Sequence, residues 1–190
     1  CFVLLISIVP LCCHYNSPNI LNYLYSDVVG KSPNPRASKK ELLDGRCGST
    51  FTNNGHDVCT HEVGSESSCT EGGIKAVHLA AFFGNLNILR ILRDKFDADF
   101  GQRTMKGLTP LHCAAQRKEG IVTIYYLKDT YKYFDPNATD IHGGTPLHYA
   151  IMSIEEYNIH ALMSLGSDIN KKDKKGDSVL HVALARYIDD

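Results

Sequence analysis

The sequence predicts an all-α fold in which a repeated unit is stacked into a solenoid, and two observations support this prediction. An eight-residue stretch, GGTPLHYA at 143–150, recurs in close or looser form at 107–114, 73–80 and 176–183. Between the copies, apolar residues follow a helical spacing, as in residues 88–92. A unit that recurs every 20–50 residues, roughly, is the mark of a repeat architecture, in which each unit buries its apolar face only against its neighbours.

The stretch at 143–150 is typical of a turn that leads into a helix. Gly143 and Gly144 permit a tight turn with positive φ. Thr145 is a good N-cap, because its hydroxyl can accept from a backbone N–H that has no partner within the helix. Pro146 suits the first helical position, where its missing N–H costs nothing. Each copy of the stretch therefore marks the start of a repeat.

One histidine recurs in register in the four copies, and it sets the period of the repeat. These histidines are His78, His112, His148 and His181. Successive histidines lie 34, 36 and 33 residues apart, with a glycine five residues before and an alanine two residues after each of them. Because both flanking positions match in all four copies, chance does not account for the register.

The TPLHxA motif at this period is similar to that of the ankyrin repeat family, and the resemblance covers about residues 72–187. It implies antiparallel helix pairs joined by β-hairpin turns, with hairpin tips at 140–143 and 173–176, in a curved stack with an extended concave surface. The segment GSDIN at 166–170 resembles the family's repeat ending. An insertion at 128–134 explains the spacing of 36 residues.

We predict two parts, an N-terminal segment of residues 1–71 that is poorly ordered, largely disordered or linker, and a repeat domain of residues 72–190 with about three and a half repeats. Residues 45–73 are mostly polar and offer too little apolar surface to offset chain entropy. Residues 19–29 fit a short helix or a strand. The apolar run at 1–13 is shorter than the roughly 20 residues that span a bilayer. It fits a signal-peptide remnant, the end of a transmembrane helix, a buried strand or sequence from outside the reading frame.

The first and last copies depart from the motif. The first has Lys75 and Ala76 in place of Thr-Pro, and terminal repeats are often atypical because they cap the stack. The fourth reaches Asp190 before a second helix, so we expect further repeats or another domain to follow in the intact protein. We expect four apolar residues of this copy to lack a covering neighbour: Val179, Leu180, Val182 and Leu184.

Composition limits the partners and the compartment. The formal net charge of −1 provides no field for nucleic acid, so we expect no nucleic-acid partner. The seven cysteines are an odd number without a symmetric spacing, which favours a reducing compartment. We therefore expect a cytoplasmic location, or the cytoplasmic face of a membrane if a downstream domain provides the membrane contact.

No metal or cofactor is expected. The N-terminal segment lacks the tight ligand pairs of zinc sites, although it contains Cys47, His56, Cys59, His61 and Cys69. The repeat histidines would lie roughly 10 Å apart in neighbouring repeats, too far to share one ion. The resemblance implies instead that each histidine bridges hydrogen bonds within and between repeats.

No catalytic residue is expected either. Cys113 and His112 are adjacent on a helix, so their side chains diverge and form no nucleophile pair. The sequence has no phosphate-binding loop, no nucleophile elbow and no HExxH motif. Enzyme activity therefore stays uncertain only because a catalytic domain could follow Asp190.

The resemblance places the two residues after the double alanine of each first helix on the concave face. In the first repeat these are two aromatics, more than packing needs. With their counterparts and one tip residue, the predicted binding residues are Phe82, Phe83, Gln116, Arg117, His142 and Met152. We predict a protein–protein interaction module that binds another protein through its concave face and hairpin tips. The lysines at 171–175 fit a solvated tip, a contact for an acidic partner or a contact for an anionic membrane.

A second hypothesis rests on a looser resemblance to the N-terminal ankyrin region of membrane-bound DHHC-type protein S-palmitoyltransferases. It is carried by GTPLHYA at 144–150 and NKKDKKG at 170–176. It implies that the array recruits substrates. The Asp-His-His-Cys motif is absent from this sequence and would lie beyond Asp190.

Overall fold

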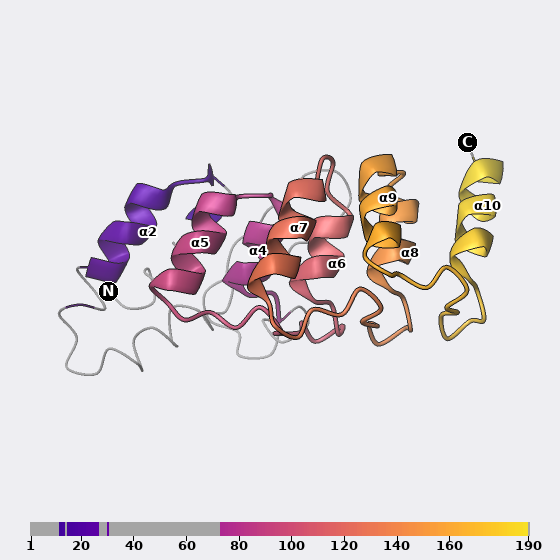
Figure 1. Ribbon diagram of the computed structural model, residues 1–190, viewed down its shortest axis with the longest axis horizontal. Helices are drawn as coiled ribbons and strands as arrows, with labels where there is room; N and C mark the ends of the chain where they lie inside the picture. Colours follow the sequence, from indigo (N-terminus) through magenta and orange to yellow (C-terminus); the bar gives the residue numbers. More distant parts are fainter. Residues whose placement is uncertain (1–11, 14, 27–29, 31–72, 190) are drawn as a thin grey trace, which may run out of the picture.

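The computed structural model describes residues 12–13, 15–26, 30 and 73–189, and its regular elements there are helices (Figure 1). Their bounds are α2 Pro18–Leu24, α4 Ala76–Phe82, α5 Leu86–Asp94, α6 Pro110–Ala115, α7 Ile121–Thr130, α8 Pro146–Met152, α9 Glu156–Ser164 and α10 Val179–Asp189. Within these described ranges, β pairing is limited to one isolated antiparallel bridge between Lys172 and Ser178. The predicted all-α class is therefore confirmed.

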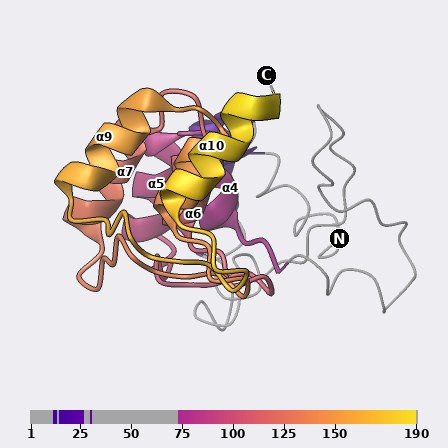
Figure 2. The same ribbon diagram turned by 90° about the vertical axis from the view of Figure 1, so that its right-hand side faces the viewer.

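The helices form a one-dimensional stack of pairs. α4 and α5 contact each other, as do α6 with α7 and α8 with α9, and α10 begins a fourth unit beside α8. The first helices contact one another in the order α4, α6, α8, α10. Seen end-on, α5, α7 and α9 form one layer and α4, α6 and α10 lie in the other, with the hairpins along one edge (Figure 2). The predicted solenoid of helix pairs is confirmed.

Each first helix starts with a backbone N–H that donates to Nδ1 of the repeat histidine three residues later, and α8 shows the complete arrangement. The Thr145 hydroxyl accepts from the N–H of His148 at 3.4 Å, and the Nδ1 atom of His148 accepts from the N–H of Thr145 at 3.2 Å. This is a capping box in which histidine takes the place usually held by Glu or Gln. The histidine of the motif is thus required by the helix start itself.

The other ring nitrogen of the first three repeat histidines reaches a carbonyl of the next repeat. The Nε2 atom of His78 lies 3.1 Å from the carbonyl oxygens of Gln102 and Leu108. The Nε2 atom of His112 lies 3.2 Å from the Gly144 oxygen, and that of His148 lies 3.4 Å from the Asp177 oxygen. Because Nδ1 accepts, Nε2 carries the proton and donates in the neutral ring. The predicted bridging role of the histidines is confirmed.

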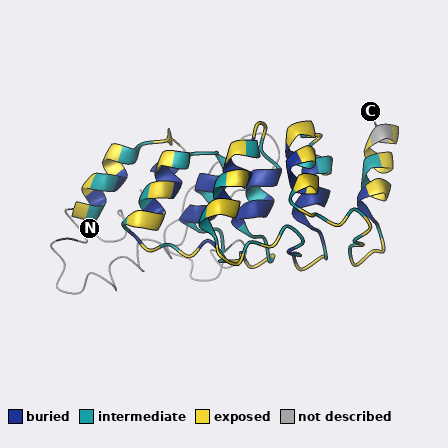
Figure 3. Ribbon diagram, in the orientation of Figure 1, coloured by how far each residue is buried: buried dark blue, intermediate teal, exposed yellow. Residues whose placement is uncertain are grey.

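Alanine keeps the first helices close together. The five alanines of these helices with no exposed surface are Ala80, Ala81, Ala114, Ala115 and Ala150. Their small side chains let neighbouring helices approach, and the second helices close the other side with buried leucine and isoleucine, such as Leu92 and Leu162. Figure 3 shows these buried faces turned toward neighbouring helices and the exposed faces turned outward.

Residues 12–13 and 15–26 pack against the first repeat, which the histidine motif did not predict. α2 contacts α5, and Cys12, Cys13, Leu21 and Leu24 are all buried in the common core. Polar contacts reinforce the packing, since the Asn85 amide donates to the Cys13 carbonyl and the Lys95 ammonium donates to the Asn22 amide oxygen at 2.8 Å. Residues 19–29 fit a helix or a strand, and the part of this range that the structure describes, residues 19–26, is helical.

Other expectations for the N-terminal segment lie outside the described residues. These include the apolar start at 1–11 and the cysteines and histidines between 47 and 69. The predicted boundary between residues 71 and 72 stays a prediction. Among the helices that the structure describes, none is both long enough and apolar enough to cross a membrane.

The last helix leaves part of its apolar surface exposed. Leu180 and Leu184 are each 60% exposed and Ile188 is 73% exposed. The expectation of an uncovered face is therefore correct for Leu180 and Leu184. It is wrong for Val179, which is 1% exposed, because this residue packs inward as part of the core.

Candidate protein-binding surface

Hydrogen-bonded turns form the hairpin tips at the predicted positions. In the tip at 140–143, the Asp140 N–H donates to the Gly144 oxygen at 3.0 Å and the Gly143 N–H donates to the Asp140 oxygen at 3.1 Å. Residues 173–176 repeat this pattern, and a third tip at 104–107 precedes α6 in the same way. The predicted tips at 140–143 and 173–176 are confirmed.

Backbone hydrogen bonds join each tip to the next. The Ile141 N–H donates to the Lys106 oxygen at 2.9 Å, and the Lys174 N–H donates to the His142 oxygen at 2.8 Å. Glycine is required at these junctions. Gly143 has a φ of 81°, and a Cβ atom there would lie 2.9 Å from the Lys174 nitrogen. The tips therefore form a continuous edge with a fixed register.

The aspartate carboxylates of two tips accept hydrogen bonds from their own hairpins. One carboxylate oxygen of Asp140 accepts from the N–H groups of His142 at 2.8 Å and Gly144 at 2.7 Å. The other accepts the Tyr149 hydroxyl at 2.6 Å, and burial together with this carboxylate raises the pKa of Tyr149. Asp173 accepts from the N–H groups of Lys175 and Asp177 at 2.8 and 2.9 Å. Both carboxylates are thus committed to holding their own hairpins.

Five of the six predicted binding residues lie at the ends of neighbouring first helices. Phe82, Gln116 and Met152 each stand four residues after the repeat histidine, at the C-terminal ends of α4, α6 and α8. Phe82 is 37% exposed and Met152 is 51% exposed. Gln116 is partly buried and its amide donates to the His112 oxygen at 3.3 Å. These positions form a row across three adjacent helices, which we call the helix-end row.

Phe83 and Arg117 hold the first part of this row in place. The rings of Phe82 and Phe83 meet edge to face with centroids 5.3 Å apart. The Arg117 guanidinium donates to the Phe82 oxygen at 3.2 Å and lies over Gly84, where a Cβ atom would come within 2.7 Å of its Nε. Phe83 and Arg117 are both partly buried, so they support the row more than they extend its exposed area.

His142 lies apart from the other five residues. It is exposed in the tip that precedes the start of α8, whereas the helix-end row lies at the far ends of the first helices. The structure therefore divides the predicted set into a helix-end row and a tip residue. Their role in binding stays a prediction.

The remaining reactive groups that the sequence singled out are held in unreactive forms. Burial lowers the pKa of His78 and of His112 to about 4, so both rings are neutral at neutral pH. Burial raises the pKa of the Cys113 thiol to about 12, which keeps it protonated. In the described part of the chain, no three His, Cys, Asp or Glu residues are grouped so that they could hold a metal ion.

Position within the hairpins identifies surface residues that the sequence interpretation missed. Met105 and Lys106 occupy the tip positions that correspond to Ile141 and His142, and all four are exposed. The signal was present in the spacing to the repeat glycine, since these residues stand two and one positions before Gly107 and Gly143.

A cavity of about 110 Å³ lies beneath the insertion that follows α7. Its lining includes Phe100, Arg103, Tyr131, Tyr133, Phe134 and Asp135. The Tyr131 hydroxyl lies against Gly101, where no side chain larger than hydrogen fits. None of the six predicted binding residues lines this cavity.

Comparison with known proteins identifies the repeat. A family model described as "Ankyrin repeats (3 copies)" matches residues 11–125 and 77–173. The human "Ankyrin repeat domain-containing protein 53" is 34% identical over 95 residues, which is 48% of this chain and 18% of the human protein. The chain thus spans less than a fifth of the length of this relative.

Proposed function

This chain belongs to the ankyrin repeat family, whose arrays generally bind other proteins, and on that premise we propose that the array holds a protein partner against its helix-end row. The partner would also touch the hairpin tips, with His142 as one contact. The single observation that carries the proposal is the exposure of Phe82 and Met152, at 37% and 51%, at equivalent positions of the first and third units of the stack.

The helix-end row has the properties of a binding surface. Exposed Phe and Met side chains supply apolar area that becomes stabilising when a partner covers it, and aromatic residues, Met and Arg are enriched at protein interfaces. Phe82 is also preorganised, because Arg117 holds its backbone oxygen and Phe83 contacts its ring before any partner arrives. Binding therefore needs little further ordering of this side chain.

A reducing, cytoplasmic location fits the cysteines of the described residues. Cys12, Cys13 and Cys113 are free thiols, and the first two are buried in the core. Burial raises the pKa of the Cys12 thiol to about 11, which disfavours the thiolate that disulfide formation needs. The relationship to palmitoyltransferases stays a prediction, since no contact in the array bears on it.

Paired substitutions test the helix-end row. A partner captured with the full chain is purified, and its affinity is measured for the wild type and for Phe82→Ala/Met152→Ala. We expect a loss of about tenfold or more, because exposed interface anchors of this kind contribute on the order of 1 kcal/mol or more each.

The matched control is Tyr157→Ala/Met163→Ala, which removes one exposed aromatic and one exposed methionine from α9, in the other layer of helices. This control is expected to bind as the wild type does. Circular dichroism establishes that all three proteins keep the same helical content. Equal affinity of the wild type and the Phe82/Met152 variant would show that the partner binds elsewhere.

A further inference from the structure

We propose that the outer face of the hairpin tips binds an extended acidic segment of the protein partner. The proposal rests on the proposed function and specifies the chemistry of one partner segment. The surface, which we call the basic tip row, consists of Met105, Lys106, Ile141, His142, Lys174 and Lys175.

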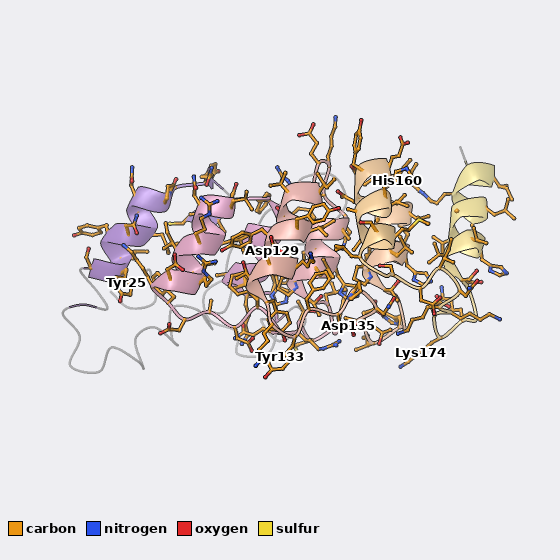
Figure 4. All side chains as sticks on the ribbon, viewed as in Figure 1. Tyr25, Asp129, Tyr133, Asp135, His160 and Lys174 are labelled. Carbon is orange, nitrogen blue, oxygen red and sulfur yellow. The ribbon has the colours of Figure 1, made fainter. Side chains whose placement is uncertain are left out.

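The tips present these six side chains in a fixed register. Each tip contributes the two residues before its glycine, and all six are exposed. The bonds from Ile141 N–H to the Lys106 oxygen and from Lys174 N–H to the His142 oxygen, at 2.9 and 2.8 Å, join the three tips into one edge. Lys174 extends from this hairpin edge, away from the helices (Figure 4). The row is therefore a linear surface rather than a set of independent loops.

The acidic and basic side chains of this edge have different surroundings. Asp140 and Asp173 are the only acidic residues in the three tips, and both accept hydrogen bonds from backbone N–H groups of their own hairpins, Asp140 as a buried side chain and Asp173 as a partly exposed one. The Tyr149 hydroxyl takes the second oxygen of Asp140. Lysine and histidine side chains occupy the outer positions instead. A chain of formal net charge −1 thus carries a locally basic edge.

The lysine-rich segment at 171–175 does not act as a single cluster. The Lys171 ammonium donates to the Asn137 oxygen at 2.9 Å and so fastens its own loop to the preceding repeat. Lys174 and Lys175 are exposed at the tip itself. Lys172 is exposed as well but precedes the tip, so the lysines that the tip itself presents are Lys174 and Lys175.

Apolar side chains are interleaved with the charges. Met105 is 59% exposed and Ile141 is 46% exposed, each beside a basic or titratable neighbour of the same tip. A partner segment that alternates acidic and apolar residues would satisfy both kinds of position. Burial of the two apolar side chains would add affinity that salt does not screen.

An extended peptide matches the spacing of the row. Equivalent positions of neighbouring repeats are separated by roughly one helix-packing distance, about 8–10 Å. An extended chain in the polyproline II conformation rises about 3.1 Å per residue with three residues per turn, so acidic residues at every third position lie on one face and meet successive tips. An anionic membrane fits less well, because polybasic lipid sites usually present clusters of about 4–8 Lys or Arg.

The test uses a fluorescent peptide of about 12 residues that repeats Glu-Leu-Ser, so that acids fall at every third position. Its affinity is measured by fluorescence anisotropy for the wild type and for Lys106→Glu/Lys174→Glu. We expect the variant to bind about tenfold or more weakly, since two attractions become repulsions. Met105→Ser/Ile141→Ser should weaken binding several-fold, and this loss should persist at about 0.5 M salt, where the charge contribution is screened.

The matched control is Lys118→Glu/Lys128→Glu, which changes the net charge equally through two exposed lysines away from the tips. This control should keep at least half of the wild-type affinity. A peptide with Lys in place of Glu should bind the wild type much more weakly. Equal losses for the tip variant and the control would overturn the proposal, because binding would then follow net charge alone.

Two further arms separate the alternatives. Vesicles of phosphatidylcholine and phosphatidylserine should not bind measurably, and tighter binding to vesicles than to the peptide would overturn the proposal in favour of a membrane contact. Phe82→Ala/Met152→Ala should leave peptide affinity unchanged. If Phe82→Ala/Met152→Ala loses partner binding, the proposed function is supported. If Lys106→Glu/Lys174→Glu nevertheless binds the peptide as the wild type does, the acidic segment is rejected while the proposed function stands.

Discussion

The two ends of the array differ in how their apolar faces are covered. At the N-terminal end, α2 lies against α5, and Leu21 and Leu24 are 0% and 3% exposed. At the other end of the described array, α10 leaves Leu180 and Leu184 each 60% exposed. One end of the described array is therefore covered by a helix that precedes the first copy of the histidine motif, whereas the last described helix leaves its equivalent surface exposed.

The same repeat positions have opposite environments inside the array and at its open end. Leu147 and Leu180 each stand one residue before the repeat histidine, yet Leu147 is 0% exposed and Leu180 is 60% exposed. The difference shows that burial here is set by the neighbouring unit rather than by the residue. This is the expected behaviour of a stack stabilised by nearest-neighbour contacts.

The largest expected effect compares a buried and an open copy of one alanine. Ala150→Glu should abolish the cooperative unfolding transition, because a buried unpaired carboxylate costs several kcal/mol. Ala183→Glu changes the same repeat position in α10, where the residue is partly exposed and the carboxylate can reach water. Thermal unfolding followed by circular dichroism measures both. Equal damage by the two substitutions would contradict the assigned register.

The second comparison tests the sealed end directly. Leu21→Ala should lower the free energy of unfolding by about 2–5 kcal/mol, since it empties a fully buried site between α2 and the first repeat. Leu184→Ala should change it by less than about 0.5 kcal/mol, because that side chain already faces water. Urea denaturation at equilibrium gives both values. A Leu21→Ala variant as stable as the wild type would show that α2 does not seal the array.

The smallest expected effect concerns the glycines of the tips. Gly143 and Gly176 have φ values of 81° and 91°, so alanine strains the backbone at both by about 1–2 kcal/mol. At Gly143 an added Cβ also meets the backbone of the next tip, whereas at Gly176 nothing lies within 4 Å. We expect Gly143→Ala to be the more destabilising by about 1 kcal/mol or more. Equal midpoints of urea denaturation for the two variants would show that the added Cβ atom at residue 143 is accommodated without a loss of stability.

The repeat register could be predicted because its causes are local. The histidine caps its own helix through Thr145, and the glycine five residues earlier provides the positive φ of the tip. Such requirements act within a few residues, so they appear in the sequence at every repeat. The exposure of Phe82 and Met152 followed from the same register.

The candidate surface was predicted only in part. The sequence placed Arg117 among the binding residues, but the structure shows that it holds the Phe82 carbonyl. The backbone hydrogen bonds of Asp140 and Asp173 could not be predicted from composition, in which the two aspartates offset nearby lysines. Only the folded tips distinguish the aspartates, which accept backbone hydrogen bonds, from the lysines, which stay exposed.

The sequence by itself determined the class of fold, the start of each first helix and the order of the stack, because these depend on short motifs that recur at a fixed period. Tertiary structure alone decided which faces are covered. The described N-terminal residues, which include α2, reach the first repeat through contacts such as Cys13 to Ala76, which are 63 residues apart in the chain. A contact between segments so distant depends on how whole helices dock, and no periodic pattern of residues records it.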